Sequence, residues 1–105
     1  MKIIILGCGS SIGSPWITNN WGSCDKKNKL NNRTRCSAII QKGNFSVLID
    51  TSPDIRNQFL KNKIKDIDYV LYTHEHSDHT SGIFELRPFF LKYKKKLIFM
   101  QIKEH

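Results

Sequence analysis

A single stretch carries most of the information in this chain, and it reads Thr73-His74-Glu75-His76-Ser77-Asp78-His79. Three of the four histidines fall within it. Imidazole and carboxylate groups are good ligands for zinc and similar divalent metals. Alternate residues of an extended segment share a face, so His74 and His76 are expected to project to one side. Asp78 and His79 follow on the next turn, and the stretch therefore predicts ligands for two adjacent metal positions. A solvated loop with chance histidines is the alternative, which the clustering disfavours.

The residues on either side of the histidines predict regular structure. Asp68-Tyr69-Val70-Leu71-Tyr72 is an apolar, aromatic and β-branched run, typical of a buried strand. Gly82 comes after the histidines, and residues 83–91 predict the start of a helix. A strand, a ligand loop and a helix together would hold the site on a rigid scaffold.

The rest of the chain predicts a sheet with helices mostly on one face. Ser52 is expected to cap a helix that has Pro53 at its first position. Residues 8–35 are a long polar loop, in which Trp16 and Trp21 either pack or cover a substrate entrance, and we favour packing. Further strands are predicted over residues 2–6, 37–41, 45–49 and 97–100, the second and third as a hairpin.

Length and composition limit the class of protein. The 105 residues allow one small domain. The sequence contains no apolar run of about 18 residues, so no membrane span is predicted. The apolar run after Lys2 is too short for a signal peptide. The three cysteines, Cys8, Cys24 and Cys36, have no CxxC spacing. This cysteine pattern favours free thiols in the reducing cytoplasm. The lack of a long apolar run predicts no membrane partner.

The net charge of +8 has two interpretations. A basic surface can bind nucleic acid through its phosphates. The chain is also rich in Lys, Asn and Ile together, which is typical of an A/T-biased coding sequence. Charge alone therefore favours a solvated basic surface over a nucleic-acid partner.

Four segments together resemble the metallo-β-lactamase-fold hydrolases. The branch they resemble contains phosphoribosyl cyclic phosphate phosphodiesterases and tRNA 3′-end-processing nucleases. His74-Glu75-His76-Ser77-Asp78-His79 matches the HxHxDH signature of the family. The other three matching segments are Ile3-Ile4-Ile5-Leu6-Gly7-Cys8-Gly9-Ser10-Ser11, Asn32-Arg33-Thr34-Arg35-Cys36-Ser37 and Val47-Leu48-Ile49-Asp50-Thr51-Ser52-Pro53-Asp54.

The resemblance implies an α/β fold, the N-terminal half of a metallo-β-lactamase αββα sandwich, with a mixed sheet and helices. It implies a metal-dependent hydrolase, a phosphodiesterase above all, acting on a small phosphodiester or nucleotide-like substrate. His74, His76, Asp78 and His79 would bind two divalent ions, with zinc favoured and manganese or iron as alternatives. Asp78 would also handle a proton. Asp50 would support the metal loop by hydrogen bonding, with a simple turn aspartate as the alternative.

The chain also departs from this family. A complete member has a further histidine, a bridging aspartate and a last histidine in its second half, whereas only His105 follows the cluster. Residues 1–105 are therefore expected to form an incomplete domain. Residues 97–105 resemble an out-of-frame tail, because a shift of one nucleotide permits the family sequence there. A frameshift near Lys94–Lys96 would explain this. The isolated chain is then predicted to be inactive, as a truncated non-enzymatic remnant or as half of a split protein needing a second chain.

Overall fold

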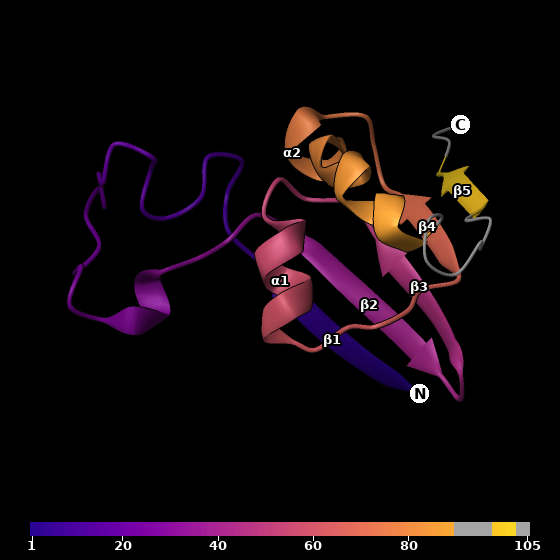
Figure 1. Cartoon of the computed structure of the whole chain (residues 1–105). Coiled ribbons are helices and arrows are strands. Elements are labelled where there is room, and N and C mark those ends of the chain that lie inside the picture. Colours follow the sequence, from indigo (N-terminus) through magenta and orange to yellow (C-terminus); the bar gives the residue numbers. More distant parts are fainter. Residues whose placement is uncertain (90–97, 103–105) are drawn as a thin grey trace.

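The computed structural model describes residues 1–89 and 98–102, which form a five-stranded mixed sheet with helical segments (Figure 1). The sheet order is β1-β2-β3-β4-β5, the order of the chain. β1 pairs antiparallel with β2 and β2 with β3, whereas β3–β4 and β4–β5 are parallel. The strands are β1 Lys2–Gly7, β2 Ser37–Lys42, β3 Phe45–Ile49, β4 Tyr69–Tyr72 and β5 Ile98–Gln101. Because β1, β3 and β4 run in the same direction, their C-terminal ends meet at one edge of the sheet.

The predicted α/β fold class and the predicted strands are confirmed. The hairpin pairs Lys42 with Phe45, so that Gly43 and Asn44 make its two-residue loop, and Gly43 has a φ of 59° there. A positive φ is the conformation that tight hairpin loops require and that glycine adopts without strain. The lysine tract at residues 92–96, residue 97 and residues 103–105 lie outside the described residues.

The predicted helix boundaries are wrong in two places. The first helix, α1 Ile55–Lys61, begins later than expected, because its N-cap is Asp54 and not Ser52. The Asp54 carboxylate does not cap the helix but pairs with Arg35, a partner distant in sequence. After the histidines, helical winding begins at α2 Ser77–Thr80 and continues as the 3-10 helix η2 Ser81–Leu86, before the predicted start at residue 83. Residues 90 and 91 of that predicted helix are outside the described ranges.

The core lies between one face of the sheet and the helical segments. Ile39 faces Leu48 across β2 and β3, and Leu48 faces Val70 across β3 and β4. These three side chains are fully buried, together with Ile55 of α1 and Leu86 of η2. Burying large aliphatic side chains stabilises a small domain by roughly 1.5–3 kcal/mol each.

The opposite face of the sheet is apolar as well, but the described residues leave it open. Ile3 of β1 faces Ile40 of β2, which faces Val47 of β3. Ile3 is 58% exposed and its neighbour Ile5 is 63% exposed. Strands that are apolar on both faces are typical of sheets covered on both sides. Burial of this face against another surface is therefore expected to be favourable.

We expect the chain to self-associate through this open face. Contiguous exposed apolar surface and unpaired sheet edges favour association. Light scattering after gel filtration should give a mass above the 12.2 kDa of one chain. Ile5→Glu should reduce the association, because it places a charge on the open face, at a position that is 63% exposed.

Ile17→Glu is the matched control, since Ile17 is fully exposed and belongs to the long loop rather than to the sheet. A wild-type chain that is monomeric at all concentrations would contradict this prediction, as would equal effects of both variants.

Candidate metal centre

The histidine stretch lies at the sheet edge where the parallel strands end. β4 ends at Tyr72, Thr73 to His76 leave the sheet, and α2 begins at Ser77 (Figure 1). His76 has a β-region conformation at the N-cap of α2, with φ −57° and ψ 142°. The residues therefore change from extended to helical within the motif, which turns Asp78 and His79 back toward His74.

The structure brings the three rings of the cluster into contact. The His74 ring centroid lies 4.7 Å from that of His76 and 4.1 Å from that of His79. Asp78 joins them, because its Oδ2 lies 3.2 Å from Nε2 of His79. The four residues expected as ligands from the sequence are thus neighbours on one loop.

Asp50 anchors both ends of this loop to the end of β3. Its side chain is 5% exposed and accepts three hydrogen bonds. The donors are the Thr73 N–H at 2.9 Å, the Thr73 hydroxyl at 2.8 Å and Nδ1 of His79 at 2.7 Å. The backbone of Asp50 has a φ of 62°, a left-handed conformation that Asp tolerates better than most residues. This conformation aims the carboxylate at the histidine loop.

These hydrogen bonds fix which nitrogen of each ring remains free. A carboxylate only accepts, so the single hydroxyl proton of Thr73 goes to Asp50. The 2.8 Å contact between Thr73 Oγ1 and His74 Nδ1 then requires His74 to donate from Nδ1. His79 likewise donates from Nδ1 to Asp50. When the rings are neutral, Nε2 of each then keeps its lone pair, which is the form that binds a metal.

Thr51 fastens α2 to the same strand end, and sequence reasoning did not identify it. It is fully buried, and its N–H donates to the His79 carbonyl oxygen at 2.8 Å. Its hydroxyl donates to the Thr80 carbonyl oxygen at 2.9 Å, so the 3.0 Å contact with Tyr72 has the tyrosine hydroxyl as donor. Burial raises the pKa of Tyr72, the hydrogen bond to Thr51 lowers it in part, and the nearby Asp50 charge raises it. Tyr72 therefore stays neutral and remains a donor.

A second network joins the turn after Asp50 to the end of the long loop. Arg35 donates from Nε to Oδ2 of Asp54 at 2.6 Å and from Nη2 to Oδ1 at 3.0 Å. The buried Gln58 donates to the Thr34 hydroxyl at 3.0 Å and to the Arg35 carbonyl oxygen at 2.9 Å. Two-point Arg–carboxylate pairs fix orientation as well as distance. The two sequence segments are therefore held together at the edge that carries the histidines.

Known proteins share the segments that form this centre. The family model described as the beta-lactamase superfamily domain matches residues 46–102, which include Asp50 and the whole histidine cluster. The chain belongs to the metallo-β-lactamase superfamily. A solved superfamily structure, a new diphosphatase from the PhnP family, is 35% identical with a TM-score of 0.79. The match covers 97% of this chain and 41% of that one.

Two further matches also extend well beyond the length of this chain. A protein named octanoyltransferase from Porphyromonas gingivalis is 42% identical over 88 residues, which are 83% of this chain and 18% of that protein. The Zn²⁺-bound PqqB of Methylobacterium extorquens is 21% identical with a TM-score of 0.68, covering 98% of this chain and 50% of its own. That likeness shows the metallo-β-lactamase fold. The chain thus spans half or less of the length of each of these relatives.

The donor types in the cluster fit a divalent metal, although they do not complete a site. Nε2 of His79 and the Asp78 carboxylate are both electron-rich and face each other at 3.2 Å, an arrangement that a cation between them stabilises. Within residues 1–89 and 98–102, however, no three side chains of His, Cys, Asp or Glu are grouped so as to hold a metal ion. The cluster therefore offers ligands of the right chemistry in too small a number for a closed site.

Cys36 lies near this centre, and its surroundings favour the neutral thiol. Burial raises the pKa of its thiol, and the charges of Cys8, Asp78 and Asp50 raise it further. Its Sγ donates to the Gly9 carbonyl oxygen at 3.3 Å. The donors that the histidine cluster itself supplies are nitrogen and oxygen atoms. None of the helices that the structure describes is long and apolar enough to cross a membrane.

Proposed function

We propose that this chain supplies one half of the active site of a metal-dependent phosphodiester hydrolase. The observation that carries this proposal is the contact between His74, His76, Asp78 and His79 at the sheet edge, with His79 held by the buried Asp50. A rigid sheet edge with preset imidazole nitrogens is suited to bind and orient divalent ions. Superfamily membership supports the same reaction class.

The substrate class rests on the most similar solved structure described above. That relative is named a diphosphatase, is 35% identical and aligns with almost all of this chain. Hydrolysis at phosphorus is therefore favoured over other reactions, and a small phosphodiester or nucleotide-like molecule is the proposed substrate. The octanoyltransferase match covers 18% of that protein, so its named activity carries no weight for this segment.

Each residue of the cluster has a role that its own contacts support. His74 and His76 would bind one divalent ion, and Asp78 and His79 a second, with zinc favoured over manganese or iron. Bound ions would supply Lewis-acid stabilisation of charge on the phosphoryl oxygens. Asp50 keeps the proton of His79 on Nδ1 and so keeps Nε2 available. The Asp78 carboxylate could take a proton from water during hydrolysis.

We also propose that residues 1–105 form an incomplete domain that needs further ligands from another segment or chain. Two observations support this: the cluster falls short of a three-ligand group, and one apolar face of the sheet is open. The isolated chain is then expected to bind metal weakly and to have no efficient hydrolytic activity.

Cobalt(II) binding tests the ligand assignment without relying on activity. The visible absorption of Co²⁺ changes when water is replaced by protein nitrogen and oxygen ligands. We expect this change in the wild-type chain, and we expect His74→Ala and His79→Ala to weaken binding at least about tenfold. The matched control is His105→Ala, which removes the one histidine outside the cluster. Equal binding by all four proteins would refute the site.

A hydrolysis assay tests whether the chain is sufficient for the reaction. With zinc or manganese and bis(p-nitrophenyl) phosphate, we expect turnover at background level, because two protein ligands per ion do not fix the ions in place. Rapid turnover that is lost in His76→Ala would show that this chain completes the site alone. Turnover that appears only after addition of a second polypeptide would support the need for further ligands.

A further inference from the structure

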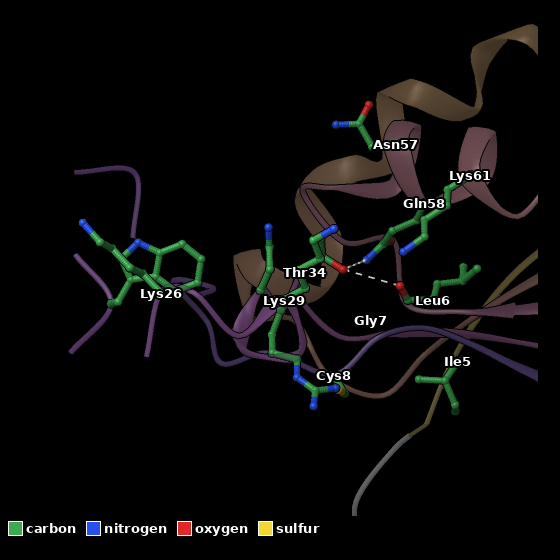
Figure 2. Close-up of a pocket in the computed structure, with 13 residues that line it drawn as sticks. Ile5, Leu6, Gly7, Cys8, Lys26, Lys29, Thr34, Asn57, Gln58 and Lys61 are labelled. Carbon is green, nitrogen blue, oxygen red and sulfur yellow. Dashed lines mark hydrogen bonds between the residues drawn. The ribbon is translucent and has the colours of Figure 1, made fainter. Parts of the chain in front are cut away.

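A basic pocket lies between α1, the end of β1 and the long loop (Figure 2). Its volume is ≈ 860 Å³. This lies within the range of cavities that hold small ligands. None of His74, His76, Asp78 and His79 lines it. The lining residues used below are Lys26, Lys29, Arg33, Lys61, Trp21 and Asn57.

The charge of the pocket is of one sign. Lys26, Lys29, Arg33 and Lys61 line it, and no Asp or Glu does so. Within the described residues, ion pairs form at Arg35, Arg56 and His79, and none involves these four cations. Four cations line one cavity that has no carboxylate in its lining, and an anionic ligand bound there would offset their charge.

The floor of the pocket is rigid, which distinguishes it from a loose group of surface lysines. Figure 2 shows Gln58 of α1 joined to Thr34, and Thr34 joined to the carbonyl oxygen of Leu6. Gly7 lies so close to Arg35 and Thr34 that a Cβ atom there would collide with their backbone and side chain. The strand end, the loop and the helix are therefore held in fixed relative positions.

Two cations are positioned by the loop itself. The Arg33 backbone exchanges hydrogen bonds with Ser14, at 2.9 Å and 2.8 Å, and its Nη1 donates to Cys8 Sγ at 3.3 Å. Lys29 begins the 3-10 helix η1 Lys29–Asn31, which the Asn28 side chain caps. The backbone of the long loop is thus held in place where it lines the pocket, and Arg33 is also held through its side chain.

The apolar and amide groups of the pocket narrow the ligand class. Trp21 is partly buried, and its ring nitrogen donates to Asn19 at 3.0 Å, which fixes the indole. An indole ring can stack on the base of a nucleotide, and lysine and arginine can bind the phosphates of the same nucleotide. Asn57 of α1 adds an amide that can donate or accept.

We propose that this pocket binds a nucleoside phosphate, with Lys26, Lys29, Arg33 and Lys61 holding the phosphates and Trp21 the base. A free nucleotide and the phosphorylated end of a nucleic-acid strand share this chemistry. The site goes beyond the proposed hydrolytic function, because it needs neither a metal nor the histidine cluster.

The test uses the full chain in EDTA, so that a failure of the metal site cannot affect the result. Trp16→Phe leaves Trp21 as the only tryptophan, and its fluorescence reports binding. We expect saturable quenching by ADP, and weakening of about tenfold or more in Lys29→Gln/Arg33→Gln. Equilibrium dialysis with labelled ADP provides a second measurement, and circular dichroism checks that each variant is folded. A 5′-phosphorylated tetraribonucleotide that binds more tightly than ADP would identify a strand end as the source.

Lys27→Gln is the control, since it removes one positive charge from the same loop outside the pocket lining, where the double variant removes two within it. We expect its ADP affinity to stay within about twofold of wild type. Equal weakening by Lys27→Gln and by the double variant would overturn the proposal, since the binding would then follow net charge alone. Absence of saturable ADP and oligonucleotide binding by the folded chain would overturn it as well.

Discussion

Replacing Asp50 by alanine is expected to lower the free energy of unfolding by about 3–5 kcal/mol, because three donors lose their common acceptor, which is itself buried. The Thr73 N–H, the Thr73 hydroxyl and the His79 ring would all be left without their partner. Alanine would also have to adopt the φ of 62° that aspartate tolerates there. Urea denaturation followed by circular dichroism measures the change.

Asp50→Asn separates the charge from the backbone conformation. Asparagine also tolerates a positive φ and keeps one acceptor oxygen, so the loss of stability should be clearly smaller than in Asp50→Ala. The amide cannot hold the His79 proton on Nδ1 as a carboxylate does, and Co²⁺ affinity should fall by about 10–100-fold. A fully stable Asp50→Ala variant would mean that the histidine loop does not depend on this carboxylate.

The second large effect is expected at Gly82, where η2 passes against the turn after β3. A Cβ atom on Gly82 would collide with the Ser52 carbonyl oxygen and approach Cγ2 of Ile55 to 2.9 Å. The Gly82 N–H donates to the Thr51 carbonyl oxygen at 3.0 Å, so the backbone cannot move away without losing that bond. Gly82→Val should therefore destabilise the chain by about 3 kcal/mol, at the upper end for overpacking.

Ser81→Val is the matched control, because it adds the same side chain one residue earlier at an exposed position. We expect its unfolding midpoint in urea to lie close to that of the wild type. Because α2 is anchored by the same turn, Gly82→Val should also weaken Co²⁺ binding, whereas Ser81→Val should not. Similar midpoints for both variants would show that η2 can shift without loss of packing.

Local sequence patterns were sufficient to predict the strands. β4 and the β2–β3 hairpin have continuous apolar runs bounded by turn residues, and the structure places them within one residue of the prediction. The open sheet face was less evident, since an apolar run does not say which of its faces is covered. The register decides this, because it aligns Ile39, Leu48 and Val70 on the helical side.

The helix boundaries depended on contacts that the sequence does not reveal. Serine is a residue type common at helix N-caps, and the Ser52 hydroxyl does accept a hydrogen bond from the Asp54 N–H at 3.1 Å. Asp54 nevertheless pairs with Arg35, 19 residues earlier in the chain, and α1 begins after it. Similarly, the close approach of Gly82 to Ser52 accompanies 3-10 winding where an α-helix was predicted.

The sequence predicted which side chains of the candidate site lie together, but not the residues that support them. The spacing of the histidines identified the cluster, and the resemblance added Asp50. Thr51 and Thr73 have no sequence signature of their own, because a single threonine beside a strand is equally common in turns and edges. Only the structure shows that Thr73 is hydrogen bonded to Nδ1 of His74 and that Thr51 holds α2.

The agreement between sheet order and chain order has a consequence for how the protein is made. Each strand is hydrogen bonded to the strand that precedes it in the sequence. During synthesis, the sheet can therefore grow one strand at a time, without waiting for a distant segment to insert between two earlier ones. The histidine loop emerges from the ribosome after β3 has positioned Asp50, so its acceptor is already in place. Assembly of the metal centre is thus expected as a late addition to a preformed sheet edge.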